Sequence, residues 1–102
     1  MIGHKFTPGP WLTKREGFST VYIEARLRQG VIQEVAACGP TEAGLEQQLA
    51  NAKLIAAAPD LLEALERLKG EIVLSDVDMD YIESHFRPWL TKAENAIAKA
   101  TS

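Results

Sequence analysis

Residues 51–65 read NAKLIAAAPDLLEAL, and this stretch determines how the C-terminal half of the chain is organised. Its apolar run, Leu54 to Ala58, ends at Pro59. Proline lacks the amide hydrogen needed inside a helix, but it is favoured in the first turn of a new one. The stretch therefore predicts a joint, where one helix ends near Ala57 and a second begins at Pro59. The apolar run is far too short to cross a bilayer, so we expect no membrane association.

Capping residues and apolar periodicity extend both helices away from the joint. Thr41 is a suitable N-cap for the first helix, which should run to about Ala57. Its expected apolar stripe comprises Leu45, Leu49, Ala52, Ile55 and Ala56. The second helix has its own stripe at helical spacing, formed by Leu61, Leu65, Leu68 and Ile72.

A third helical region begins at Ser75 or Asp76, either of which can cap it. Its expected apolar face comprises Met79, Ile82, Phe86, Trp89, Ala93 and Ala96. The pattern continues across Pro88, which predicts a kinked helix or two stacked short helices.

Strands are expected before the helices. The segment FSTVYIEARLR alternates, with an apolar face formed by Val21, Ile23, Ala25 and Leu27. Gln29-Gly30 predicts a tight turn. The returning strand, VIQEVAAC, should place Val31, Val35 and Ala37 on one face.

These elements predict one α+β domain over residues 1–102. Residues 1–10 form an extended arm, residues 11–38 a β region and residues 41–100 a helical region. The β region is an antiparallel hairpin or a three-stranded meander, and three helices pack on one of its faces.

Composition limits the classes of function. The 102 residues are 46% hydrophobic and 25% charged, with a net charge of −3, so direct nucleic-acid binding is not expected. The one cysteine, Cys38, indicates a reducing compartment, and the scarce histidines argue against a metal site. No nucleophile–base pattern is visible, so we expect neither catalysis nor a cofactor.

An acidic run provides the first candidate binding surface. Its members are Glu71, Asp76, Asp78, Asp80 and Glu83. The alternating aspartates are similar to the start of a calcium loop, but the glycine is missing and position twelve would be Arg87. Two interpretations remain: a solvated helix start, or an acidic patch that meets a basic partner.

Two further groups are candidates. In HFRPWL, Phe86 and Trp89 are expected in the core, which would leave His85 and Arg87 at the kink to contact a partner. On the polar strand face, Tyr22, Arg26 and Arg28 could hold a phosphate or nucleotide. The alternative for this face is an ordinary solvent-facing strand with pairs such as Arg26 with Glu34.

Three pieces of the chain carry a family resemblance: TPGPW at Thr7–Trp11, NAKLIAAAPDLLEAL at Asn51–Leu65 and AIAKAT at Ala96–Thr101. Together they resemble a group of small accessory proteins encoded by tailed bacteriophages and prophages. Members typically begin with TPGPW, continue with a short β region and then carry N-A-x-L-I-A-A-A-P-[D/E]-L-L-E-A-L. The Arg87-Pro88 pair departs from the usual C-terminal helix of this group.

The resemblance implies a phage accessory protein in the cytoplasm of a bacterial host. Such proteins commonly inhibit host defence by binding, so we expect a non-enzymatic inhibitor that blocks a CRISPR effector or another defence protein through its acidic surface. One alternative is a sponge that sequesters a nucleotide immune signal. The other is a structural or regulatory phage protein with no role in defence. A homodimer is compatible with each, because open sheet edges and an alanine-rich helix favour symmetric pairing.

Overall fold

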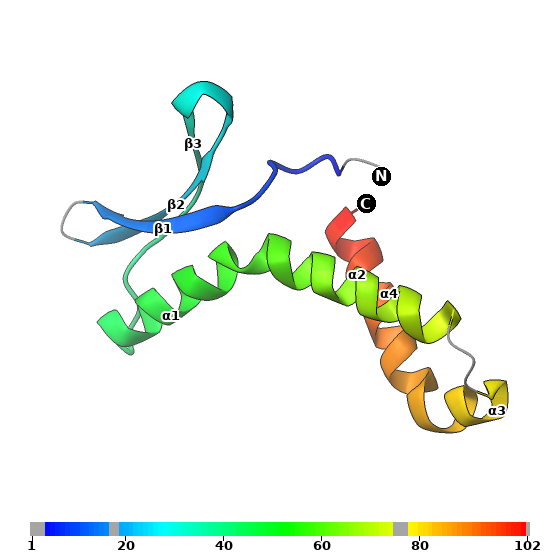
Figure 1. Cartoon of the computed structure of the whole chain (residues 1–102). Coiled ribbons are helices and arrows are strands. Elements are labelled where there is room, and N and C mark those ends of the chain that lie inside the picture. Colours follow the sequence, from blue (N-terminus) through cyan, green and yellow to red (C-terminus); the bar gives the residue numbers. More distant parts are fainter. Residues whose placement is uncertain (1–3, 17–18, 75–77, 102) are drawn as a thin grey trace. The chain divides into compact units, whose positions relative to one another are not determined.

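Three antiparallel strands form the N-terminal sheet: β1 (Trp11–Glu16), β2 (Thr20–Arg26) and β3 (Ile32–Cys38). They pair in the order β1-β2-β3, so the sheet is a meander (Figure 1). The structure is a computed structural model that describes residues 4–16, 19–74 and 78–101. Helices follow the strands, which confirms the predicted α+β class and element order.

The chain divides into two units, Met1–Asp60 and Leu61–Ser102. We call the first the sheet unit and the second the helical unit, and we describe each by itself. The expectation that the whole chain acts as one domain stays a prediction. No helix in the described ranges is long and apolar enough to span a membrane.

The turn between β2 and β3 lies where Gln29-Gly30 predicted it. A short 3-10 segment, η1 (Arg28–Gly30), places Gln29 at φ 63° and Gly30 at φ 76°. The amide of Leu27 donates to the carbonyl of Val31 at 2.7 Å and closes the turn. Gln29 therefore occupies a left-handed conformation that favours glycine or asparagine.

The prediction for the faces of β3 was wrong. The register shifts between Ile23 and Glu24, so Ile23 lies opposite Ala36 while Glu24 lies opposite Glu34. Val35 is the additional residue of this β-bulge, and a bulge reverses the faces on one side of it. As a result Val35, Ala36 and Cys38 pack against the core, whereas Val31 is 55% exposed and Ala37 is also exposed.

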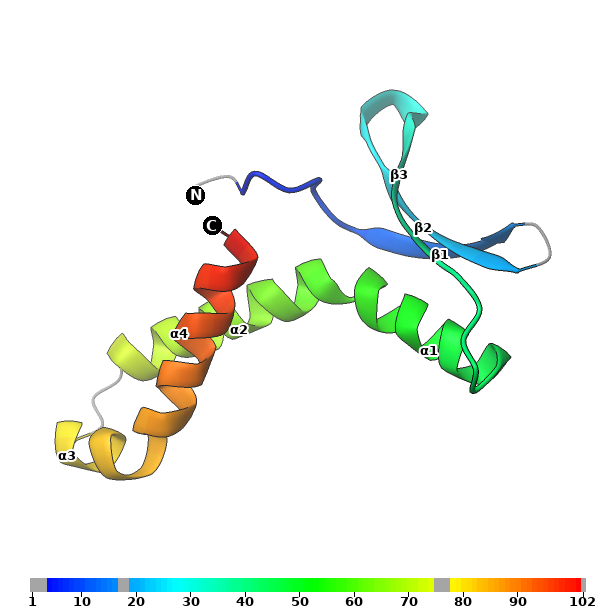
Figure 2. The same ribbon diagram turned by 180° about the vertical axis from the view of Figure 1, so that it is seen from behind.

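Helix α1 (Leu45–Ala56) covers one face of the sheet (Figure 2). Val21, Ile23 and Ala25 are at most 2% exposed, as the alternation predicted, and Ala52 of α1 is 0% exposed. A small residue at position 52 allows the helix backbone to approach the sheet closely. Leu49, Ile55 and Ala56 pack around this cluster, as predicted for the helix stripe, whereas Leu45 of the same predicted stripe is 45% exposed.

The predicted start of α1 was too early. The carbonyl of Thr41 accepts from the amide of Gly44 at 3.1 Å, which makes a separate turn before the helix. Gly44 is the N-cap at φ 95°, a conformation outside the helical region, so regular helix begins only at Leu45.

The arm is attached to the body of the sheet unit by a local ring. The indole Nε1 of Trp11 donates to the carbonyl of Thr7 at 3.0 Å, and Trp11 packs against the core cluster. A methyl group placed on Gly9 would lie 3.1 Å from Cβ of Pro59. The TPGPW segment and the Ala-Pro-Asp joint are therefore in direct contact.

Helix α2 (Ala58–Leu74) begins one residue before Pro59, which confirms the helix joint. Its faces differ from the prediction, because Leu62, Leu65 and Ile72 are half-buried while Leu61 and Leu68 are 54% and 60% exposed. The apolar arc of α2 is wider than the arc that the helical unit covers. The predicted stripe included residues from both the covered part and the uncovered part of this apolar arc.

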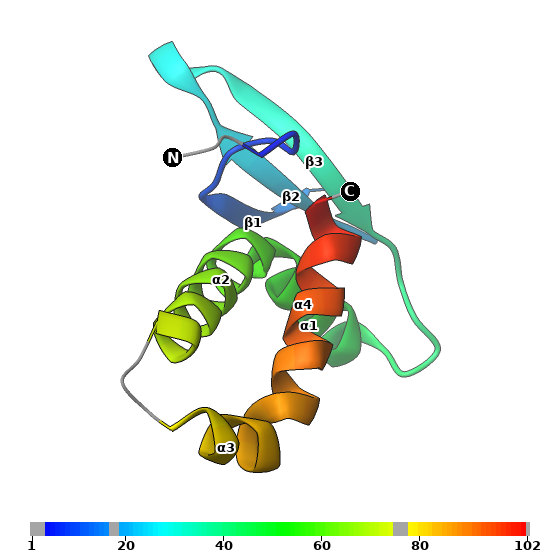
Figure 3. The ribbon, with the colours of Figure 1, turned by 90° about the vertical axis from the view of Figure 1, so that its right-hand side faces the viewer.

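The third helical region consists of α3 (Met79–Tyr81), the π-helical turn η2 (Ile82–Phe86) and α4 (Arg87–Thr101) (Figure 3). The predicted irregularity is this wide turn immediately before Pro88. Proline cannot donate to the carbonyl of Ser84, four residues earlier, and its ring would collide with that carbonyl in a regular helix. A π-helical turn relieves both problems.

The wide turn also changes which residues of α4 face inward. Ile82 and Leu90 are 2% and 4% exposed, and Phe86, Ala93 and Ile97 are half-buried. The prediction that Met79, Trp89 and Ala96 share the apolar face with these residues, with Trp89 in the core, was wrong, since Met79 is 61% exposed, Trp89 is 67% exposed and Ala96 is also exposed. The inner face advances from position 89 to position 90 after the turn.

Candidate partner-binding surface

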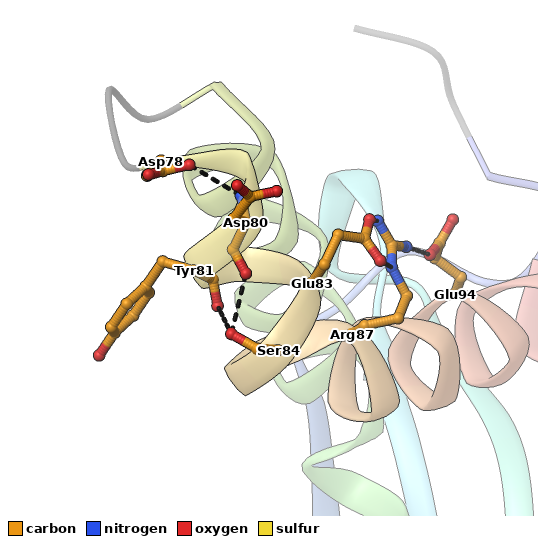
Figure 4. A network of polar contacts seen from close by, with 7 residues as sticks. All are labelled: Asp78, Asp80, Tyr81, Glu83, Ser84, Arg87 and Glu94. Carbon is orange, nitrogen blue, oxygen red and sulfur yellow. Dashed lines mark hydrogen bonds and ion pairs between the residues drawn. The ribbon is translucent and has the colours of Figure 1, made fainter.

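The acidic residues cluster at the start of α3. Asp78 is the N-cap of that helix, and its carboxylate accepts from the amide of Asp80 at 2.8 Å (Figure 4). The predicted caps, Ser75 and Asp76, lie outside the described residues. Asp78 and Asp80 are both exposed, and no ion pair links either one to a described basic side chain. Their negative charges therefore face solvent.

Side chains of the π-helical turn contact backbone carbonyls of α3. The hydroxyl of Ser84 donates to the carbonyl of Asp80 at 2.8 Å, with the carbonyl of Tyr81 3.3 Å away. His85 Nδ1 lies 3.1 Å from the Tyr81 carbonyl and 3.0 Å from the Ser84 hydroxyl. Such side-chain bonds supply donors where the regular helical ladder is interrupted. Ser84 and His85 are thus in contact with backbone groups of the preceding helix α3.

An aromatic stack stands beside the acids. The rings of Tyr81 and His85 are 4.0 Å apart and nearly parallel, at 16°. Tyr81 remains 48% exposed, and its ring also lies 5.8 Å from that of Phe86. Tyrosine combines a large apolar area with a polar end and loses little conformational entropy, so it is frequent at binding hot spots.

Arg87 neutralises part of the acidic run. Its guanidinium donates to Glu83 through two bonds, of 2.8 and 3.2 Å, and lies 3.6 Å from Glu94 (Figure 4). The hydrogen bonds from Arg87 hold the pKa of Glu83 below its usual value, and those same bonds raise the pKa of Arg87. Glu83 and Arg87 are therefore engaged with each other before any partner binds.

The structure brings together most of the predicted partner-binding residues. Asp78 caps α3, and Asp80, Glu83, His85 and Arg87 lie within α3, η2 and the first turn of α4. Glu71 is exposed near the C-terminal end of α2, and Asp76 lies outside the described residues. We call Asp78, Asp80, Tyr81 and His85 the acidic–aromatic surface.

The alternative ligand-binding face lies on the outer side of the sheet. Tyr22 is half-buried there, opposite Lys14 and Ala37, while Arg26 is exposed. Arg28 is also exposed, but it lies in η1 after β2 ends at Arg26, so the prediction that placed it on the strand face was wrong. Arg26 lies opposite Ile32, so the suggested Arg26–Glu34 pair is not in direct register. Glu24 and Glu34 lie opposite each other instead, between Tyr22 and Arg26. Two facing carboxylates oppose the binding of an anionic phosphate.

Two features of the structure were not predicted from the sequence. Tyr81 joins the candidate surface, and the spacing of Tyr81 and His85 at i and i+4 was the available signal. Gln48 is only 4% exposed, and its amide donates to the carbonyls of Ser19 and Cys38. No local pattern distinguishes Gln48 from its exposed neighbour Gln47.

The described ranges contain no group of histidine, cysteine and acidic side chains arranged to hold a metal ion.

A family model described as Salmonella phage P22 protein Y8K6 matches residues 1–102. Comparison with curated proteins and with solved structures gave no match.

Proposed function

Because the chain belongs to the phage family of Salmonella phage P22 protein Y8K6, we propose that it is a phage-encoded, non-enzymatic binding protein that inhibits a host defence protein. The observation that carries this proposal is the acidic–aromatic surface. Two solvent-facing carboxylates, Asp78 and Asp80, lie beside the exposed Tyr81–His85 stack. Charge and aromatic area together are typical of protein recognition.

The partner that fits this surface is a protein with a basic face. Carboxylates attract such a face over several ångströms and raise the rate of association, while a tyrosine supplies buried area after contact. Defence proteins that handle nucleic acid, including CRISPR effectors, present basic surfaces of this kind. A protein bound there would compete with the nucleic acid for the same positive charges.

Affinity capture with charge-neutralised variants tests the acidic–aromatic surface. The Asp78→Asn/Asp80→Asn variant removes both charges, yet asparagine still caps α3. We expect the wild-type chain to capture a basic host protein, and the variant to bind that protein at least about tenfold more weakly. The loss should shrink as salt is added, because salt screens exposed charges.

The matched control is Glu42→Gln/Glu46→Gln, which changes the net charge equally at exposed positions before and within α1. It should bind like the wild type. Equal binding by all three proteins would refute the role of the acidic–aromatic surface.

A separate experiment tests the role in defence. Phage with and without the gene would be plated on hosts that contain or lack a given defence system. The proposal predicts a plating defect of the deletion phage only where the defence system is present, and the Asp78→Asn/Asp80→Asn phage should share it. A growth defect that is independent of host defence would instead favour a structural or regulatory role.

The nucleotide-sponge alternative predicts a different result. A nucleotide that binds the native chain would raise its melting temperature, and Arg26→Ala would abolish that rise. The Glu24–Glu34 pair on the same face is unfavourable for this mode of binding.

A further inference from the structure

An uncovered apolar stripe runs along α2. Leu61, Ala64 and Leu68 follow one another at i, i+3 and i+7, so they share one side of the helix. Leu61 and Leu68 are 54% and 60% exposed, and Ala64 is also exposed. Leu65 and Ile72 border the stripe on its half-buried side. The stripe is thus a continuation of an apolar face that the helical unit leaves open.

The helical unit has little core of its own. Among its described residues, only the side chains of Ile82 and Leu90 are buried. A unit of this size needs more apolar burial than two side chains provide, and small domains often obtain it by oligomerisation. Covering the α2 stripe would supply further burial where leucine side chains are already aligned.

Charges beside the stripe are arranged for self-pairing. Asp60 and Arg67 are seven residues apart and flank the stripe on the same side, opposite to Leu65 and Ile72. When two copies of a helix pack antiparallel, equivalent flanks meet each other. An axis near Ala64 would place Leu61 against Leu68 of the second copy, and Asp60 against Arg67 of the second copy.

The intramolecular ion pair of Arg67 does not prevent this arrangement. Arg67 lies 3.2 Å from Glu63, and the two side chains are 76% and 63% exposed. An ion pair as exposed as this one contributes little to stability, so Arg67 can exchange it for a contact with Asp60. The small side chain of Ala64 at the axis permits close approach of the two backbones.

We propose that α2 is the interface of a symmetric homodimer, in which the Leu61–Ala64–Leu68 stripe of one chain packs antiparallel against the same stripe of a second copy. A two-fold axis makes one patch contact itself, which requires self-complementary shape and charge. The stripe has both properties. It is shorter than a standard protein interface, so the expected dimer dissociates on the order of micromolar concentration.

Sedimentation equilibrium of the full chain over about two decades of concentration measures this association. The wild type should approach twice the 11.2 kDa of one chain. Leu61→Glu/Leu68→Glu should remain monomeric at every concentration, with helical content checked by circular dichroism. The control is Val31→Glu, since Val31 is 55% exposed and lies in the sheet unit. A monomeric wild type, or a stripe variant that still dimerises, would overturn the proposal.

A second, milder variant tests the interface even if Leu61→Glu/Leu68→Glu does not fold. Leu61→Ala/Leu68→Ala keeps strong helix formers in α2 and adds no charge. It should stay folded and dissociate at a concentration at least about tenfold higher than the wild type, because apolar burial is lost from both chains. An unchanged dissociation constant would contradict the assigned interface.

Charge reversal tests the flank. Asp60→Arg alone and Arg67→Asp alone each place like charges opposite one another in the proposed dimer, so each should dimerise more weakly than the wild type. An equimolar mixture of the two variants restores both attractive pairs and should recover wild-type association. Failure of the mixture to recover would exclude the proposed pairing of Asp60 with Arg67.

Cysteine crosslinking tests the direction of packing, in a background where Cys38, the chain's one cysteine, is alanine. In an antiparallel dimer, Leu61→Cys should form disulfides with Leu68→Cys when the two proteins are mixed. Neither should form them alone. Crosslinking of Leu61→Cys with itself would indicate a parallel arrangement and would refute the proposed geometry.

Discussion

The sheet unit and the helical unit differ in how they bury apolar side chains. In the sheet unit, Val21, Ile23 and Ala25 of β2 and Ala52 of the covering helix α1 are at most 2% exposed. In the helical unit, the described residues include only two buried hydrophobic side chains, Ile82 and Leu90. Most of the large exposed apolar side chains also belong to it: Leu61, Leu68, Val73, Leu74, Met79, Tyr81 and Trp89.

This difference in apolar burial indicates different roles for the sheet unit and the helical unit. The sheet unit buries an apolar cluster of its own, and we expect it to be the more stable of the two units. The helical unit keeps its apolar and acidic groups at the surface, where another chain can contact them. The exposed groups include Tyr81, on which the proposed host-protein contact depends, and Leu61 and Leu68, on which the proposed dimer depends.

The largest expected change in the free energy of unfolding results from a cavity in the sheet unit. Ile23→Ala removes a side chain that is 0% exposed and should reduce the free energy of unfolding by about 2–5 kcal/mol. Urea denaturation measures the loss, with Trp11 fluorescence as the reporter in a Trp89→Phe background, because Trp11 packs on the cluster and Trp89 is 67% exposed.

Leu90→Ala is the corresponding change in the helical unit. Its neighbours, including Phe86 and Ala93, are only half-buried and can collapse into the space, so the loss should lie at the low end of the same range. A greater loss for Leu90→Ala than for Ile23→Ala would contradict the comparison.

The second prediction concerns the buried amide of Gln48. Gln48→Met keeps the length of the side chain but removes the bonds to the carbonyls of Ser19 and Cys38. Two carbonyls would then lose their partner at the edge of the core, so unfolding should become easier by about 1–3 kcal/mol. Thermal and urea denaturation measure this change. Gln47→Met, at the exposed neighbouring position, should have almost no effect.

The positions used in these predictions show how much of the fold could be predicted from the sequence. The alternation of β2 predicted Val21, Ile23 and Ala25 correctly, because a strand has a fixed period of two and the additional residue of the bulge lies in β3 rather than in β2. The same reasoning was wrong in β3, since the additional residue at Val35 reverses the faces and carries no local signature.

In the helices, Pro59 was a sufficient signal for the joint, but the inner face of α4 was not predictable. A π-helical turn shifts the face by one residue, and its presence depends on how the backbone adapts before Pro88. Part of the candidate site could be predicted from the sequence. Glu83 with Arg87, and Tyr81 with His85, both have the i, i+4 spacing of neighbours on a helix.

A third prediction compares a glycine-to-alanine substitution in the helical unit with one in the sheet unit. Gly70→Ala lies within α2, where an added methyl group meets no atom within 4 Å, so it should stabilise the helix by about 0.5–1 kcal/mol. Gly9→Ala places a methyl group 3.1 Å from Cβ of Pro59, whose ring is rigid and lies in the first turn of α2. That variant should be less stable than the wild type by about 1 kcal/mol.

Thermal denaturation of the two variants and the wild type tests this prediction. The melting temperature should rise for Gly70→Ala and fall for Gly9→Ala. Both substitutions add the same group, so composition cannot explain a difference between them. A stabilised Gly9→Ala protein would show that the arm does not pack tightly on the joint.

The smallest expected effect is electrostatic and depends on pH. Arg87 lowers the pKa of Glu83 in the folded chain, so this ion pair stabilises the fold above the ordinary pKa of a glutamate, and the contribution disappears as the pH falls through the lowered value. Glu83→Gln should therefore be slightly less stable than the wild type at neutral pH and equal to it in acid. Urea midpoints at neutral pH and at a pH below the lowered pKa of Glu83 test this prediction.

The control for that measurement is Glu63→Gln. Glu63 makes a single contact of 3.2 Å with an arginine that is 76% exposed, whereas Glu83 accepts two bonds from Arg87. A bidentate pair is held in one geometry and should contribute more than a single exposed contact. If both variants lose the same stability at neutral pH, Arg87 does not order the acidic end of the helical unit, and the acidic–aromatic surface would have to be held by the Asp78 cap and the Tyr81–His85 stack alone.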